Sequence, residues 1–346
     1  MAKITLDNLS FRYPGATQDT ITNLNLQVPH GEAHALLGAS GAGKTTLLNL
    51  LSGLLIPTSG TLTFGDIDVT QLSGRDRDVA QVFQFPVLYE SLSVADNLRF
   101  PLKTRRLERS MIEARLDYIC AELGLDEIRQ VKSAQLNLFQ KQLTAVGKAL
   151  MRPDTSLVLL DEPLTAVEPR IKWRLRQTLR RVQADLGVTM IYVTHDQTEA
   201  LTFAERVSVL TEDGILQTGT PAQIYASPEH EFVGHFVGSP GMNFIPAKTV
   251  AIEAAERVGF RPEWASLVAK TSDTAIFQGT VTRIRLQGTE AGQPFGVVSL
   301  ATEFGEISVR SDVGLAALKV ADTLGICVNR YVSYYNQLKV GEGELV

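Results

Sequence analysis

The chain has 346 residues, of which 21% are charged, and its formal net charge is −5. Acidic and basic residues are interspersed, which argues against a nucleic-acid-binding surface, because such surfaces concentrate Lys and Arg. The two cysteines lie far apart without metal-ligand spacing, a pattern that fits a reducing cytoplasm. No run of about 18 apolar residues occurs, so any membrane role is expected to come through a partner.

The first informative motif covers residues 38–45. These residues are Gly38, Ala39, Ser40, Gly41, Ala42, Gly43, Lys44 and Thr45, which match the phosphate-loop pattern G-x-x-x-x-G-K-[ST]. An apolar run precedes the loop, and a Leu-rich helical pattern from Lys44 to Leu55 follows it. Small residues allow backbone N–H groups to surround phosphates, Lys44 reaches the β and γ oxygens, and Thr45 offers a hydroxyl to Mg²⁺. We therefore predict a nucleoside triphosphate site that also includes Thr46.

The remaining elements predict two domains. Residues 1–80 read as strands and turns, and residues 86–150 read as a helical subdomain with helices at 111–123 and 143–151. Apolar runs at 157–160 and 190–193, separated by a helix at 170–186, are typical of buried parallel strands. We therefore expect an α/β ATPase domain over 1–240. After the turn-rich segment 238–246, short strand-like runs predict a small all-β, barrel-like domain over 248–346.

Two carboxylates follow the apolar run at 157–160. Asp161 suits the coordination shell of Mg²⁺, and Glu162 suits a general base for an attacking water. The alternative is a pair of acids that simply begins a helix after a strand. The phosphate loop upstream favours the catalytic interpretation.

Three further segments carry a family resemblance. They are Tyr-Val-Thr-His-Asp-Gln at 192–197, Gly-Thr-Pro at 219–221 and Gly-Ser-Pro-Gly-Met-Asn-Phe at 238–244. With the phosphate loop and the two carboxylates, they make residues 1 to about 245 resemble the ATP-binding subunits of ABC transporters, most closely those of maltose-type carbohydrate importers. The tail resembles the regulatory domain of that family, which has an oligonucleotide-binding-like fold.

The resemblance implies roles for three more side chains. Tyr13 corresponds to the aromatic residue that stacks on adenine, although it would otherwise be an ordinary turn tyrosine. Gln84 corresponds to the glutamine that senses Mg²⁺ and water, and His195 to the switch histidine that contacts the γ-phosphate. The implied cofactors are ATP and Mg²⁺. The other four histidines lie in no such motif, and we expect them to be ordinary structural or surface residues.

The resemblance also implies partners. We expect two membrane-spanning permease subunits, a second ATPase subunit, indirect contact with an extracytoplasmic solute-binding protein, and a peripheral position on the cytoplasmic face of the plasma membrane. Residues 86–90 and 93–98 would receive a helix of the membrane subunit, with Phe85 and Tyr89 exposed, although these aromatics could instead belong to the core. The expected solute is a sugar or polyol, such as glycerol, glycerol phosphate or an oligosaccharide. A soluble ATPase acting on nucleic acid or ribosomes is the alternative, and a non-hydrolysing regulatory subunit is a third hypothesis.

Two segments depart from the family pattern. The family signature Leu-Ser-Gly-Gly-Gln is replaced by Leu136-Asn137-Leu138-Phe139-Gln140, and Glu168 stands where the family has a shorter acid in the segment 164–169. We expect Leu138 and Phe139 to obstruct approach to a γ-phosphate, because glycines leave that approach open. In the family, each ATP lies between one subunit's phosphate loop and the other subunit's signature. A good loop with a degenerate signature therefore favours a heterodimer over a homodimer.

Overall fold

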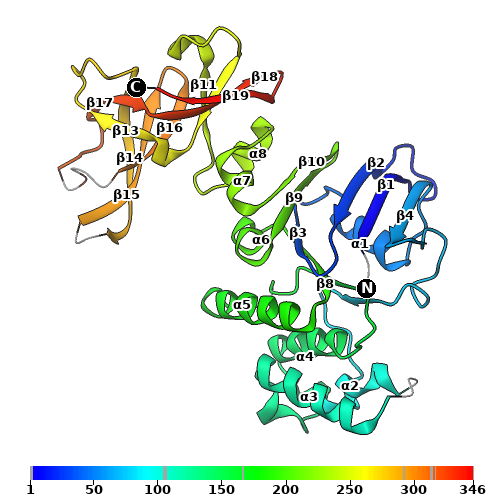
Figure 1. Cartoon of the computed structure of the whole chain (residues 1–346). Helices are drawn as coiled ribbons and strands as arrows, with labels where there is room; N and C mark the ends of the chain where they lie inside the picture. Colours follow the sequence, from blue (N-terminus) through cyan, green and yellow to red (C-terminus); the bar gives the residue numbers. More distant parts are fainter. Residues whose placement is uncertain are drawn as a thin grey trace. The chain divides into compact units, whose positions relative to one another are not determined.

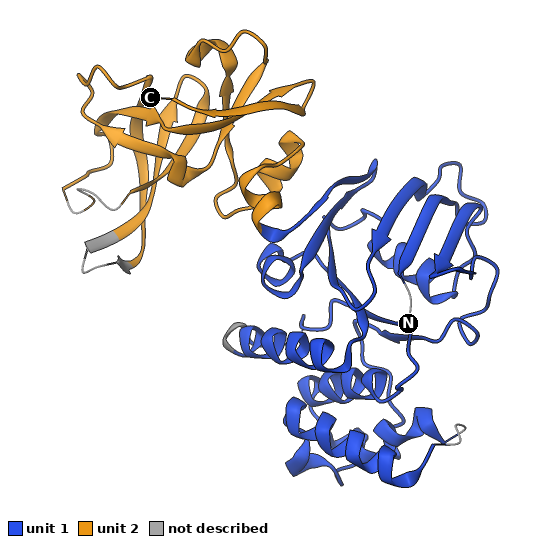
Figure 2. Ribbon diagram, in the orientation of Figure 1, with its two compact units in different colours: residues 1–221 blue, residues 222–346 orange. Residues whose placement is uncertain are grey.

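The computed structural model describes residues 3–103, 107–165, 167–290, 293–311, 315 and 317–345. The chain divides into two compact units, residues 1–221 and 222–346 (Figure 2). The first unit combines helices with a largely parallel sheet, and the second is built mainly from antiparallel strands, so the predicted fold class is confirmed. The division between units falls earlier than the expected boundary at 240–248, because residues 222–247 associate with the second unit. The expected domains, an ATPase domain over 1–240 and a regulatory β domain over 248–346, stay predictions.

A six-stranded sheet forms the centre of the first unit. Its order is β10 (Gly214–Gly219), β9 (Arg206–Thr211), β3 (Ala33–Leu37), β8 (Thr189–Thr194), β7 (Leu157–Asp161) and β6 (Val79–Val82). The strands from β9 to β6 pair in parallel, and β10 pairs antiparallel with β9. Every residue of β3, β7 and β8 is buried, because both faces of the sheet are covered.

One face of this sheet shares a core with a second, antiparallel sheet and helix α1 (Lys44–Ser52). The second sheet has the order β2 (Ile21–Val28), β1 (Ile4–Phe11), β4 (Ser59–Phe64) and β5 (Ile67–Asp68). Helix α1 was expected to reach Leu55 but ends at Ser52. Gly53 adopts a left-handed conformation with φ 78°, and its N–H bonds to the carbonyl of Leu50, which closes the helix.

The other face packs against helices (Figure 1). These are α2 (Val94–Arg99), α3 (Arg109–Leu123), α4 (Leu138–Leu150), α5 (Pro169–Leu186) and α6 (Gln197–Phe203), with short 3₁₀ turns η1 (Phe100–Leu102), η2 (Asp126–Ile128) and η3 (Ser133–Gln135). Helix α4 begins five residues before the expected start at Leu143. No helix among the described residues is long and apolar enough to cross a membrane.

The second unit contains two antiparallel sheets. One has the order β11 (Asn243–Pro246), β12 (Arg257–Phe260), β18 (Arg330–Tyr335), β19 (Leu338–Glu344). The other has the order β13 (Ala265–Val268), β17 (Thr323–Val328), β14 (Phe277–Glu290), β15 (Gln293–Thr302), β16 (Gly305–Ser311). Helices α7 (Pro221–Ala226) and α8 (Glu231–Phe236) precede them, and η4 (Ala247–Val250) and η5 (Pro262–Trp264) connect strands.

A buried cation joins α7, α8 and the residue after α8 to the strands of this unit. Arg261 is fully buried, and its guanidinium donates to the carbonyls of Tyr225, Gly234 and Val237. The same guanidinium lies 4.2 Å from the centre of the Tyr225 ring. Burial and a hydrogen bond to Glu263 raise the pKa of Tyr225 to about 12, so this side chain stays neutral beside the cation.

Replacing Arg261 with Met should destabilise the second unit by about 2–4 kcal/mol, because buried carbonyls lose their donors. Thermal and urea unfolding of the full chain would measure this change. Arg257→Met is the matched control, since Arg257 is half-exposed and pairs with Glu231 at 2.7 Å, an interaction worth about 1 kcal/mol or less. Equal effects of the two substitutions would contradict the prediction.

Candidate nucleotide-binding site

The site lies at the carboxyl edge of the parallel sheet. Leu37 of β3 pairs with Thr194 of β8, and Asp161 of β7 pairs with Val193 of β8. The phosphate loop, Glu162 and His195 therefore follow the ends of three neighbouring strands, and these ends lie side by side. This arrangement brings together the motifs that were separate in the sequence.

The phosphate loop owes its path to glycine. Gly41 and Gly43 have φ values of 89° and 83°, which other residues rarely adopt. Because Gly43 has no side chain to cap α1, the first N–H groups of that helix stay available to an anion. The loop and the helix start thus form an anion-binding cradle.

Lys44 is folded onto this cradle. Its Nζ donates to the carbonyls of Gly38 at 2.9 Å and Ala39 at 2.7 Å, and the residue is buried. Burial lowers the pKa of Lys44, and the nearby carboxylates of Glu162 and Asp161 oppose that effect. The side chain therefore holds its ammonium group against the first two residues of the loop.

Thr45 and Asp161 supply two neighbouring oxygen atoms. Thr45 Oγ1 donates to Asp161 Oδ2 at 3.4 Å. Burial, and next the charge of Glu162, raise the pKa of Asp161. The described residues hold no cluster of three or more His, Cys, Asp or Glu side chains suited to a metal. A hydroxyl and one carboxylate nevertheless fit Mg²⁺, which is usually held by one or two protein groups together with substrate phosphates.

Glu162 lies at the centre of a set of side-chain contacts. Its Oε1 is 2.7 Å from His195 Nδ1, and its Oε2 accepts from Thr165 Oγ1 at 3.2 Å and from Gln84 Nε2 at 3.5 Å. Its backbone is left-handed, with φ 44°, and its N–H donates to the carbonyl of Val193 at 3.0 Å. The structure therefore brings together the three residues for which catalytic roles were predicted. Sequence reasoning missed Thr165, whose only signal is a hydroxyl three residues after Glu162.

Tyr13 lies beside the start of α1, at Thr46. Its hydroxyl is 3.1 Å from Thr46 Oγ1, its ring packs edge-on against Phe11, and 40% of the residue is exposed. This placement leaves ring surface accessible to a planar ligand. Stacking on adenine stays a prediction.

Other histidines have structural contacts, as expected for residues without a motif. His34 is buried, with Nδ1 2.8 Å from Glu32 Oε1 and Nε2 2.9 Å from Ser208 Oγ. His230 caps the start of α8 by accepting the N–H of Phe232. Neither contact involves the phosphate loop.

The degenerate signature forms the start of α4. Asn137 accepts the N–H of Gln140 at 2.8 Å, and the Gln140 side chain accepts the N–H of Asn137 at 3.1 Å, which is a capping box. Leu138 is exposed, whereas Phe139 is half-buried and packs against the core. The expectation that both side chains project as obstacles is wrong for Phe139, which packs against the core, and stays a prediction for Leu138. The capping box engages one N–H of the first turn, that of Gln140.

The segment 164–169 leads from Glu162 into α5. Leu164 is buried, and Glu168 precedes the helix without capping it through its side chain. Ala166 lies outside the described residues. The consequence of Glu168 replacing a shorter acid stays a prediction.

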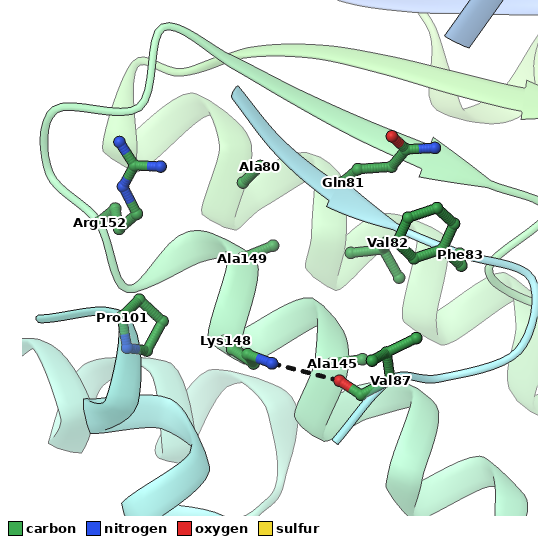
Figure 3. A pocket seen from close by; sticks show the side chains of 10 residues that line it. All are labelled: Ala80, Gln81, Val82, Phe83, Val87, Pro101, Ala145, Lys148, Ala149 and Arg152. Carbon is green, nitrogen blue, oxygen red and sulfur yellow. Dashed lines mark hydrogen bonds between the residues drawn. The ribbon is translucent and has the colours of Figure 1, made fainter. Parts of the chain in front are cut away.

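A pocket of about 220 Å³ lies between β6 and α4 (Figure 3). Phe83 and Val87 line it on one side, and Ala145 and Lys148 line it on the other. Lys148 Nζ donates to the carbonyl of Val87 at 3.2 Å. Phe85, two residues after Phe83, is 74% exposed. The pocket adjoins the segment that was predicted to receive a partner helix.

The chain is similar to proteins of a known family. The family model described as ABC transporter matches residues 21–165. The sn-glycerol-3-phosphate import ATP-binding protein UgpC of Ruegeria pomeroyi is 35% identical over 94% of this chain and 96% of its own length. The trehalose/maltose import ATP-binding protein MalK of Thermococcus litoralis is 40% identical over 66% of this chain and 62% of its own length. Among solved structures, cbiO1 of Clostridium perfringens, part of the ABC transporter complex cbiONQ, has a TM-score of 0.60 at 26% identity and covers 65% of this chain and 90% of its own.

Lys44→Ala should raise the dissociation constant for ATP by about 10- to 100-fold, because a charge-assisted contact to phosphate is lost. Calorimetric titration of the full chain with ATP and Mg²⁺ would measure the change. Lys141→Ala is the control, since Lys141 pairs with Glu90 at 3.6 Å outside the loop. Unchanged affinity in the Lys44 variant would contradict the assignment.

Proposed function

This chain belongs to the family of ABC transporter ATP-binding subunits, and we propose that it hydrolyses ATP to energise the import of a sugar or polyol across the cytoplasmic membrane. The observation that carries the proposal is the contact of Glu162 with His195 and Gln84 beside the phosphate loop. The relatives named as importers of glycerol phosphate and of trehalose or maltose support the solute class. Glycerol, glycerol phosphate and oligosaccharides are the candidate solutes.

The loop residues and Lys44 bind the β- and γ-phosphates of ATP, and Tyr13 stacks on the adenine ring. Thr45 and Asp161 would hold Mg²⁺, Gln84 would serve as a further ligand, and the bound ion would neutralise phosphate charge. The donor positions support this assignment, because Thr45 Oγ1 and Asp161 Oδ2 already lie 3.4 Å apart. Buried Lys44 needs no large movement to meet an anion in the loop.

Glu162 takes the proton of the attacking water. Its Oε1 forms the short contact with His195, whereas its Oε2 has only the longer contacts with Thr165 and Gln84. Oε2 is therefore the atom that can exchange a partner for water at the smaller cost. His195 holds the other oxygen and contacts the γ-phosphate when nucleotide is bound.

The pocket between β6 and α4 supports an interaction with partner subunits. The half-buried Lys148 lines the cavity of about 220 Å³, and the exposed Phe85 follows two residues after the lining residue Phe83. We infer that a cytoplasmic helix of each membrane-spanning permease subunit docks there. The chain then lies peripherally on the cytoplasmic face of the membrane, and an extracytoplasmic solute-binding protein acts on it only through the permease.

The second ATPase subunit is proposed to be a different protein. The Asn137 side-chain oxygen accepts the N–H of Gln140 in its own helix, and Leu138 adds an exposed apolar side chain at the same end. A homodimer would place this altered helix start at both of its ATP sites. A partner with an intact signature would complete the site on Lys44 and Glu162.

Purification of the tagged chain from gently solubilised membranes should recover two membrane-spanning subunits and a second ATPase. In that complex, Glu162→Gln should lower ATP turnover by about 10²- to 10⁴-fold and leave ATP affinity unchanged, because only the general base is lost. Glu212→Gln, at an exposed turn, serves as the control. Recovery of ribosomes instead of membrane proteins, or full turnover in the Glu162 variant, would refute the proposal.

Changing Asn137, Leu138 and Phe139 to Ser, Gly and Gly should let the isolated chain form an ATP-bound dimer more readily. A Glu162→Gln background prevents turnover during the measurement by light scattering. Because two glycines weaken α4 by about 1 kcal/mol each, circular dichroism must show that the variant is folded. Brisk, cooperative hydrolysis by the unmodified chain alone, with a symmetric ATP-bound homodimer, would contradict the asymmetric assembly.

A further inference from the structure

A buried carboxylate outside the phosphate-binding residues connects two parts of the site. Glu199 of α6 is 3% exposed. We propose that it is a positioning residue that fixes the direction of His195 and links that histidine to the start of α5. The inference rests on the role proposed above for His195.

The Glu199 carboxylate receives hydrogen bonds from two other elements. Its Oε2 accepts from Tyr192 Oη at 2.9 Å and from Thr194 Oγ1 at 3.1 Å, both on β8. Its Oε1 accepts from Lys172 Nζ on α5 at 2.8 Å. A carboxylate with this number of donors has one well-defined position, because its two oxygens are engaged in different directions.

The tyrosine in this set remains a donor. Burial, and then the negative charge of Glu199, raise the pKa of Tyr192 well above its ordinary value. Arg176, also buried on α5, opposes that effect with its positive charge. Tyr192 therefore keeps its proton under conditions in which the enzyme works, and the contact to Glu199 is retained.

Glu199 acts on His195 through the residues on either side of that histidine. Thr194 donates to Glu199, and its Oγ1 also accepts the N–H of Asp196 at 2.9 Å. Asp196 in turn caps α6 by accepting the N–H groups of Thr198 and Glu199. Both neighbours of His195 are thus held, whereas the histidine side chain itself is 57% exposed. Its orientation toward Glu162 depends on this support.

The contact with Lys172 brings α5 into the same network. Lys172 lies in the first turn of α5, directly after the segment 164–168 that begins beside Glu162. Loss of Lys172 would leave a buried, uncompensated carboxylate, which is costly. Lys172 therefore connects Glu199, and with it the end of β8, to the start of α5.

The test compares turnover and KM for ATP in the purified complex. Glu199→Gln should lower kcat by about tenfold and leave KM within about twofold, because alignment of His195 is lost while the phosphate loop is intact. His195→Ala is the reference for complete loss of the histidine. Glu205→Gln is the matched control, since Glu205 also pairs with α5, through Arg180 at 2.7 Å, without contacting the end of β8.

A double variant separates positioning from stability. Glu199→Gln combined with Lys172→Met removes both charges, so its thermal midpoint should exceed that of Lys172→Met alone. Its kcat, measured where the protein is fully folded, should nevertheless stay as low as in Glu199→Gln. Wild-type kcat in either Glu199 variant, while His195→Ala is inactive, would overturn this inference and leave the proposed function intact. Full activity of His195→Ala would instead remove the role of His195 and, with it, this inference.

Discussion

The parallel register of β3, β8 and β7 is the constraint on which the candidate site depends. Leu37 lies opposite Thr194 and Asp161 lies opposite Val193, so three strand ends deliver their polar residues at one level. Two cores fix this register, because Leu157 and Leu159 of β7 pack on one face and Val158 and Leu160 on the other. A slip by one residue would exchange the two faces and displace both carboxylates.

Much of the first unit could be predicted because its signals are local. The apolar runs of β7 and β8 end in polar residues, and Gly38 to Thr45 follow a strand and precede a helix. Parallel strands buried on both faces have continuous apolar sequences, so strand ends and site residues are visible together. Glu162 was therefore expected near the loop, whereas His195 and Gln84 were expected there from the family resemblance, and the structure brings the three side chains into contact.

Other features depend on contacts that no local pattern reports. Asn137 and Gln140 form a capping box, so α4 starts earlier than the spacing of its apolar residues indicates. In the sequence, these two residues had been noted only as part of a degenerate signature. Arg261 satisfies carbonyls 24 to 36 residues away, which moves residues 222–247 into the second unit. Glu199 and Lys172 meet only after α5 and α6 pack together. These side chains are ordinary in sequence, and tertiary structure alone gives them partners.

The left-handed backbone at Glu162 lowers the stability of the fold at a residue that is proposed to be needed for activity. A side chain with a Cβ costs roughly 1–2 kcal/mol in that conformation, whereas glycine adopts it freely. Glycine at this position would remove the conformational cost, but it would also remove the carboxylate that contacts His195. The fold therefore retains a locally unfavourable conformation because the turn that follows β7 must both reverse direction and present an acid. Selection for a more stable chain alone would act against the residue on which turnover is proposed to depend.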